Sequence, residues 1–182
     1  MTQKYPNDWA LISNSVIDGW NIIFIGKGFD KNFLTDGQQR FNEFGLTGCL
    51  NLYNSNVIDV LIKINKGMCE DSLNIISSSG NLSSIEINDS YADALDFDTS
   101  FINIDSILIK NASNDCIDLS SGNYNFNYIK ANKCGDKGVS IGEKSNVQIT
   151  KLDINNSNIG VSSKDYSFTK IVNANIFDSM FC

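Results

Sequence analysis

Three aspartates in the middle of the sequence have spacings that suit chemistry on a sugar chain. Asp96 and Asp98 are two residues apart, and Asp118 follows Asp96 after 22 residues. Two carboxyl groups that flank a glycosidic bond can hydrolyse it, at about 5 Å from each other for retention of configuration and at about 6.5 to 9.5 Å for inversion. Adjacent strands lie about 4.8 Å apart and residues two apart on one strand about 7 Å, so a sheet leaves both outcomes open.

A second reaction, elimination, would use a lysine. A polysaccharide lyase employs Ca²⁺ and a Lys or Arg base that removes the proton from the sugar carbon next to the carboxylate. Lys137 is the candidate base, because Asp115 and Asp136 accompany it. The candidate catalytic residues are therefore Asp96, Asp118 and Lys137, with no committed metal site and with Ca²⁺ as a candidate cofactor. The candidate substrate-binding residues are Asp93, Asp98, Asp115, Asp136, Glu143, Lys144, Tyr91 and Tyr124.

These residues belong to a repeat of 22 residues. Apolar residues recur at positions 73, 95, 117, 139 and 161, and a second apolar series recurs at 82, 104 and 126, then slips by one residue before 149 and 171. Apolar and polar residues alternate over short runs, which is typical of strands, and Asn, Asp, Ser and Gly between the runs supply turns. This pattern predicts an all-β fold, a solenoid of parallel coils stacked about 4.8 Å apart around ladders of Leu, Ile, Val and Phe.

We expect one domain over residues 1–182, with regular coils over 48–180 and an earlier coil over 9–20. The stretch 27–45 interrupts the pattern and is too long for a simple turn. Insertions in solenoids often lie on the binding face, and an excursion that covers the end of the stack is an equal alternative. The strand-like sequence near both termini suggests a segment of a longer protein.

Composition and charge argue against several classes of protein. The net charge of -7 and the pI near 4.4 oppose nucleic-acid binding, which needs clustered Lys and Arg. No apolar run approaches the roughly 18 residues of a membrane span, and no export signal opens the chain. Five cysteines without a C-x-x-C pair, in a chain without His, oppose a zinc site and a full disulfide framework. We interpret the cysteines as small apolar residues packed inside.

Period-two alternation along the strands places the aspartates outside the core. If Leu73 points inward, Asn74 points outward, and the same column continues with Asp96 and Asp118. Stacked carboxylates about 5 Å apart repel by about 1 kcal/mol in bulk water and by several-fold more near a protein surface. Raised pKa values, a bound Ca²⁺ or pairing with lysines could offset the repulsion, and the sequence leaves all three open.

Structural roles are the alternative for several of these residues. Asp71, Asp93 and Asp115 begin successive predicted strands, where Asp commonly bonds backbone amides of the neighbouring coil and holds the turn. Mid-strand acids that point outward do little for a turn, which leaves binding as an equal alternative for them. Tyr91 and Tyr124 lie near the acidic coils and could stack on sugar rings or pack in the core.

Two segments carry a resemblance to a known superfamily. The segments 114–118 (Asn-Asp-Cys-Ile-Asp) and 135–142 (Gly-Asp-Lys-Gly-Val-Ser-Ile-Gly) resemble the right-handed parallel β-helix proteins of the pectin-lyase-like superfamily, over about residues 48–180. The chain is also similar to uncharacterised bacterial β-helix repeat proteins, through segments such as 93–96 (Asp-Ala-Leu-Asp). These resemblances imply a right-handed β-helix, a polysaccharide partner and an extracellular or cell-envelope location.

The resemblance to polygalacturonase-type hydrolases of that superfamily is incomplete. Those enzymes use three acids on successive coils and a Gly-His-Gly motif. Asp93 and Asp115 match two of the acids, Asn114 stands at the position of the third, and Lys137-Gly138 replaces His-Gly. The Arg-x-Lys substrate clamp has no match.

We therefore expect a module that binds, and could also cleave, a cell-surface or extracellular polysaccharide along the face of Asp96, Asp98 and Asp118. The alternative is a non-catalytic scaffold in a larger envelope-associated protein, with neighbouring domains as its partners.

Overall fold

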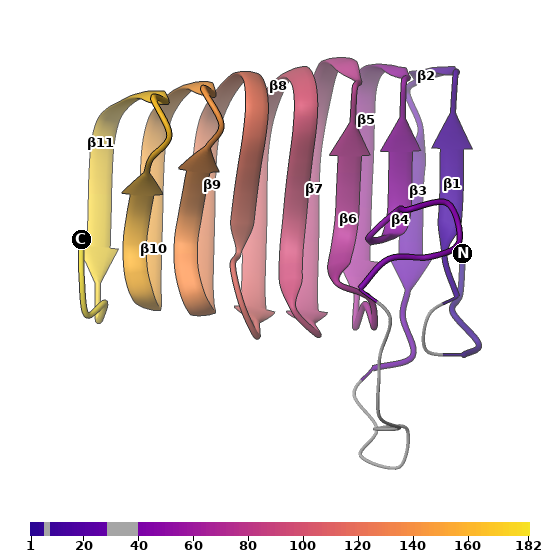
Figure 1. Ribbon diagram of the computed structural model, residues 1–182, viewed down its shortest axis with the longest axis horizontal. Helices are drawn as coiled ribbons and strands as arrows, with labels where there is room; N and C mark the ends of the chain where they lie inside the picture. Colours follow the sequence, from indigo (N-terminus) through magenta and orange to yellow (C-terminus); the bar gives the residue numbers. More distant parts are fainter. Residues whose placement is uncertain (6–7, 29–39) are drawn as a thin grey trace.

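The computed structural model describes residues 1–5, 8–28 and 40–182, and these form a parallel β-solenoid (Figure 1). About six turns of about 22 residues stack along one axis, and the two termini lie at opposite ends of the stack. Among the described residues no helix is long and apolar enough to cross a membrane. The strands are β1 (Ala10–Ser13), β2 (Val16–Asp18), β3 (Asn21–Ile25), β4 (Gly48–Tyr53), β5 (Asn56–Asn65), β6 (Asp71–Ile76), β7 (Ser79–Ser90), β8 (Asp93–Ala112), β9 (Ile117–Gly142), β10 (Asn146–Ser163) and β11 (Phe168–Phe177).

The predicted apolar series form continuous ladders inside the coils. The second series pairs rung by rung, as Leu82, Ile104, Phe126, Ile149 and Ile171. The first four of these side chains are buried, and the last packs against the core at the open end. The pairing of residue 126 with residue 149 contains the slip of one residue read from the sequence. The period of 22 residues is thus confirmed by the register.

One sheet of the solenoid, which we call the front sheet, carries most of the candidate residues. It faces the viewer in Figure 1 and contains β1, β4, β6 and the segments 93–98, 117–120, 137–142 and 159–163. The part of the insertion over residues 40–47 crosses its outer side in front of β4 and β6. The segment 29–39 of the predicted insertion lies outside the described residues.

Polar residues turn the chain at the ends of the front-sheet strands. Ser77, Thr99 and Ser121 follow successive strands and have positive φ values of 48°, 48° and 49°. On the opposite corner Asp89 and Asn111 have φ values of 60° and 67°. Asp and Asn tolerate this left-handed backbone better than other non-glycine residues, which explains part of the polar composition between the runs.

The prediction that the cysteines pack inside is confirmed for four of them and wrong for Cys182, and the sequence reasoning missed that the four are paired. Cys49 forms a disulfide with Cys69, and Cys116 forms one with Cys134. Their separations of 20 and 18 residues are close to one coil, so stacking brings the partners together without a short sequence motif. Cys182 is free and exposed.

Tyr124 lies in the core, which corrects its assignment as a substrate-binding residue. Its side chain is 1% exposed and packs against Phe97 and Phe126, with ring centroids 5.3 and 6.1 Å away. In the preceding coils each corner serine accepts a backbone N–H from the coil before it, as when Ser78 N donates to Ser100 Oγ at 3.1 Å. The Tyr124 hydroxyl takes this role for the backbone N–H of Ser100, at 3.3 Å. A sugar ring therefore has no access to Tyr124.

Glycine at position 122 makes room for the Tyr124 hydroxyl in the place of the corner serine. A Cβ at Gly122 would approach the Tyr124 hydroxyl oxygen to 2.6 Å and the Ser100 carbonyl oxygen to 2.3 Å. Its φ of 156° lies at the margin of the region that favours glycine. Gly122 and Tyr124 together replace the serine of the other coils.

We predict that Tyr124→Phe destabilises the protein by about 1 to 3 kcal/mol, because the buried N–H of Ser100 loses its acceptor. Urea unfolding followed by circular dichroism measures the change. Tyr128→Phe is the matched control, since the Tyr128 hydroxyl donates to Asp153 Oδ2 at 2.9 Å near the surface, and we expect a loss below about 0.5 kcal/mol. Equal losses in the two variants would contradict the role of the Tyr124 hydroxyl.

We also predict that replacing both Cys116 and Cys134 by serine lowers the free energy of unfolding by about 3 kcal/mol, the usual size for a closed loop of this length. Urea unfolding again provides the measurement. Cys182→Ser, the control, should leave the stability unchanged because Cys182 is exposed and unbonded. A double variant as stable as the wild type would show that the bridge does not stabilise the fold.

Candidate functional site

The front sheet carries the predicted mid-strand acids on its outer side. Asp96 pairs with Asn74 of the preceding coil and with Asp118 of the next, and Asp98 lies two residues further along β8. The intervening Phe97 is buried in the core, so alternation along the strand directs the three carboxyl groups outward. All three side chains are half-buried. The structure therefore brings Asp96, Asp98 and Asp118 together.

Burial and mutual repulsion raise the pKa values in this group. Asp71 and Asp96 titrate together, with pKa values raised to about 8 and about 10; burial is the largest cause, and neighbouring carboxylates add to it. The pKa of Asp98 is also raised, first by burial and then by the charges of Glu143 and Asp118. The pair of Asp71 and Asp96 therefore keeps protons at pH values where an ordinary carboxyl group has lost them. The sequence left three ways to offset the repulsion between stacked carboxylates: raised pKa values, a bound Ca²⁺ or pairing with lysines. At Asp96 the pKa is raised.

Several polar atoms around Asp96 lack partners among the described residues. Asp71 Oδ2 and Asn74 Oδ1 are buried and accept no hydrogen bond there. Burial and neighbouring charges, rather than hydrogen bonds, dominate the environment of the Asp96 carboxyl. Asn74 Nδ2 donates to Thr47 Oγ1 at 2.7 Å and to Asp98 Oδ2 at 3.3 Å. Unsatisfied buried polar atoms cost stability, and this cost is concentrated where the acids meet.

Two of the three acids at the strand starts, Asp93 and Asp115, form the turn ladder that was their structural alternative, whereas the backbone N–H that could reach Asp71, that of Asp93, donates to the Glu70 carbonyl oxygen at 2.9 Å. Asp93 Oδ1 accepts the backbone N–H of Asp115 and the Asn114 side-chain amide, both at 2.7 Å. Asp115 Oδ1 accepts the backbone N–H of Lys137 at 2.8 Å. Burial raises the pKa of Asp93 to about 6, although these hydrogen bonds act in the opposite direction. Asp93 and Asp115 therefore have a clear structural task.

Lys137 is held as a cation. Its Nζ contacts Asp136 Oδ2 and lies 3.4 Å from Asp115 Oδ2. Burial alone would lower the pKa of Lys137, but the hydrogen bond to Asp136 and the two negative charges outweigh it and raise the pKa above its usual value. The pKa of Asp136 is lowered by the same contact. The structure places Lys137 next to both predicted acids, and its charge opposes the role of a base.

The other residues predicted to bind substrate lie at the two corners beside the front sheet. Glu143 and Lys144 are exposed on the corner turn, with φ values of 55° and 63°. Tyr91 is half-buried and lines a cavity of about 700 Å³ on the opposite corner, together with Lys66 and Asn111. Glu143 is close enough to Asp98 to raise its pKa, whereas the Tyr91 cavity contains none of the three mid-strand acids.

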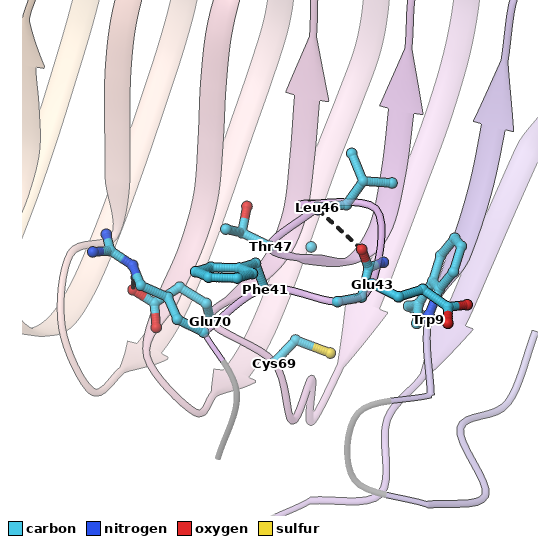
Figure 2. Close-up of a pocket in the computed structure, with 10 residues that line it drawn as sticks. Trp9, Phe41, Glu43, Leu46, Thr47, Cys69 and Glu70 are labelled. Carbon is cyan, nitrogen blue, oxygen red and sulfur yellow. Dashed lines mark hydrogen bonds and ion pairs between the residues drawn. The ribbon is translucent and has the colours of Figure 1, made fainter. Parts of the chain in front are cut away.

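A smaller cavity under the insertion was missed by sequence reasoning. It has a volume of about 300 Å³ and adjoins the front sheet at Thr47, the residue that bonds Asn74. Figure 2 shows Phe41 and Glu70 on one side and Trp9 on the other. The interruption of the repeat over 27–45 was the available signal. The lining residues are Trp9, Arg40, Phe41, Asn42, Glu43, Leu46, Thr47, Gly48, Cys69 and Glu70.

The Ca²⁺ alternative receives no support from side-chain geometry. Within residues 1–5, 8–28 and 40–182, no three His, Cys, Asp or Glu side chains are arranged to hold a metal ion. Asp93 instead accepts a backbone amide, Asp115 contacts Lys137, and the pKa of Asp96 is raised by burial and neighbouring carboxylates.

Comparison with known proteins adds no assignment. No family model matches the chain, and no curated protein and no solved structure matches it either. The function must therefore be inferred from the front sheet and its surroundings.

We predict that Asp96→Asn stabilises the protein at pH 8 by about 1 kcal/mol, or about 2 to 4 °C in Tm. Below about pH 4 the Asp96 carboxyl is protonated in both the folded and the unfolded state, so it does not destabilise the fold. As the pH rises toward 10, the unfolded state loses this proton and the folded state keeps it, so folding becomes less favourable. Asparagine resembles the protonated acid and does not titrate. The gain in Tm should therefore be small at pH 4 and should grow up to pH 8.

Thermal unfolding at pH 4, 6 and 8 measures this dependence. Asp105→Asn is the matched control, because Asp105 is an exposed acid outside the front sheet. We expect no pH-dependent gain from the control. A loss of stability in Asp96→Asn at pH 8 would contradict the raised pKa.

Proposed function

We propose that the chain is a polysaccharide-binding module whose front sheet holds the sugar chain over Asp96, Asp98 and Asp118, and that Asp96 and Asp118 cleave the bound chain by hydrolysis. The observation that carries this proposal is the half-buried Asp96, whose pKa is raised and whose counterpart on the next coil is Asp118. Asp93 and Asp115 hold turns, whereas Asp96 has a charge environment that costs stability. Protein families retain such costly groups mainly where they serve function.

The two carboxyl groups suit the roles of acid and nucleophile. Asp96 can donate its proton to the glycosidic oxygen as the bond to the leaving sugar breaks. Asp118 is its counterpart on the next coil, about 4.8 Å away along the stack, which fits the spacing of retaining enzymes. Its Oδ1 accepts only the adjacent backbone N–H of Leu119, at 2.9 Å, among the described contacts. The cationic state of Lys137 favours hydrolysis over elimination.

The disulfides support the proposed location. Structural disulfides persist in oxidising compartments, so the Cys49–Cys69 and Cys116–Cys134 bridges favour an extracellular or cell-envelope setting. We also propose that the solenoid is right-handed and related to the pectin-lyase-like superfamily, as the segments 114–118 and 135–142 suggest. The coil length of about 22 residues is consistent with this.

A non-catalytic scaffold is the second candidate. The last strand, β11, exposes Phe168, Val172 and Phe177, each by more than 60%, and such a surface can pack against a neighbouring domain. The turn ladder of Asp93 and Asp115 shows that acids in this fold also serve structure alone.

We predict that the protein binds at least one polysaccharide on a glycan array and that the Asp96→Asn/Asp118→Asn double variant loses the binding. The array is probed with and without Ca²⁺, and we expect no dependence on the ion. Asp59→Asn/Asp105→Asn removes two charges from exposed acids outside the front sheet and is the matched control. It should bind like the wild type.

Each result discriminates between the two candidates. Binding that only the front-sheet variant loses supports a sugar site and justifies an assay for new reducing ends. Absence of binding to every glycan, by a wild-type protein with an intact circular-dichroism spectrum, would leave the scaffold as the function.

A further inference from the structure

We infer that the cavity under residues 40–47 is a subsite for one sugar ring without a carboxylate, either neutral or bearing an amino group. This inference rests on the proposed function and adds the class of sugar to it. The volume of about 300 Å³ lies at the lower end of ligand pockets, so the cavity suits one ring rather than several.

The aromatic walls supply the stacking surface that a sugar ring needs. Phe41 and Trp9 line the cavity from the insertion and from the start of β1 (Figure 2). Phe41 is 59% exposed, so its ring is accessible to a ligand in the cavity. Trp9 makes an edge contact with Phe44, with ring centroids 5.5 Å apart. That contact fixes the Trp9 ring in place before a ligand arrives.

The polar atoms at the cavity include an unused donor. Asn42 Oδ1 accepts the backbone N–H groups of Phe44 and Leu46 at 2.9 and 3.0 Å, which fixes the orientation of the amide. Asn42 Nδ2 is buried and has no partner among the described residues. A buried donor of this kind costs stability, and a sugar hydroxyl oxygen would satisfy it once the side chains that cover it move aside.

The charge balance disfavours a sugar acid. Arg40 is the cation of the lining, and its Nε lies 2.9 Å from Glu70 Oε1, so its charge is compensated. Glu43 is exposed and adds a negative charge. A uronate carboxylate would meet this charge without a free cation in the described lining, whereas an ammonium group would be attracted both by Glu43 and by the aromatic faces.

The cavity adjoins the part of the front sheet that carries Asp96. Thr47 lines the cavity and accepts a hydrogen bond from Asn74, the residue that pairs with Asp96 in the adjacent coil. A ring held in the cavity would therefore be one end of a chain that continues over Asp96.

Tryptophan fluorescence tests the subsite directly. The protein has two tryptophans, and Trp20→Phe leaves Trp9 as the reporter. We expect a saturable change of Trp9 emission with glucosamine or glucose, or with their oligosaccharides, and an apparent affinity for glucuronate and its oligosaccharides at least tenfold weaker. A preference for glucuronate would overturn the inference, as would the absence of any change with all these sugars.

Phe41→Ala supplies the second arm, with Phe101→Ala as the matched control. Phe101 is also 59% exposed but lies outside the front sheet. We expect Phe41→Ala to weaken binding at least tenfold and Phe101→Ala to leave it unchanged. Equal effects would overturn the inference.

The two proposals fail in different ways. If the wild type binds array glycans through the front sheet but Phe41→Ala has no effect, the subsite is wrong and the proposed function stands. If no array glycan binds, the proposed function fails and the subsite fails with it.

Discussion

The rest of this structure depends on the parallel pairing of each coil with the next. Because the strands are parallel and the period is about 22 residues, every residue lies beside its counterpart one coil later. A residue type that recurs at one position therefore becomes a ladder. Apolar ladders fill the core, as with Leu82, Ile104 and Phe126, and serine ladders satisfy the corners, as with Ser78 and Ser100.

The same rule stacks recurring aspartates next to one another, where their charges repel, and the protein relieves this repulsion in two ways. Where the aspartate begins a strand, as Asp93 and Asp115 do, its carboxyl accepts backbone amides of the next coil. In mid-strand, Asp118 accepts only the adjacent backbone N–H of Leu119, and no hydrogen bond to the Asp96 carboxyl is found among the described residues. Burial and the neighbouring carboxylates then raise the pKa of Asp96. Position within the strand thus separates a structural acid from a chemically available one.

Much of the fold could be predicted from the sequence, because a fixed period is a local signal that many residues repeat. The register of the front sheet and the outward direction of Asp96 and Asp118 followed from alternation alone. The disulfides did not, because partners 18 and 20 residues apart match no short motif and only the stack brings them together. Tyr124 was misassigned although it stands two residues from the inward Phe126 and pairs with the apolar Ile102 and Val147 of the neighbouring coils, which together indicate the core.

The candidate site was predicted only in part for a related reason. Its regular half belongs to the repeat and could be read from it. Its other half comes from the insertion, where Phe41 and Asn42 obey no period, so their approach to Thr47 and Trp9 depends on tertiary packing. The pKa values of Asp96 and Asp71 depend on burial in the same way, and no pattern of residue types encodes burial quantitatively.

The exchange at Gly122 and Tyr124 has a consequence for how these two positions can vary. Gly122 and Tyr124 lie two residues apart in the same coil, so a change at one alters the surroundings of the other. A side chain at position 122 would collide with the Tyr124 hydroxyl, and a glycine without that hydroxyl would leave the amide of Ser100 without its acceptor. The corner serine of the other coils can therefore return here only if both positions change together.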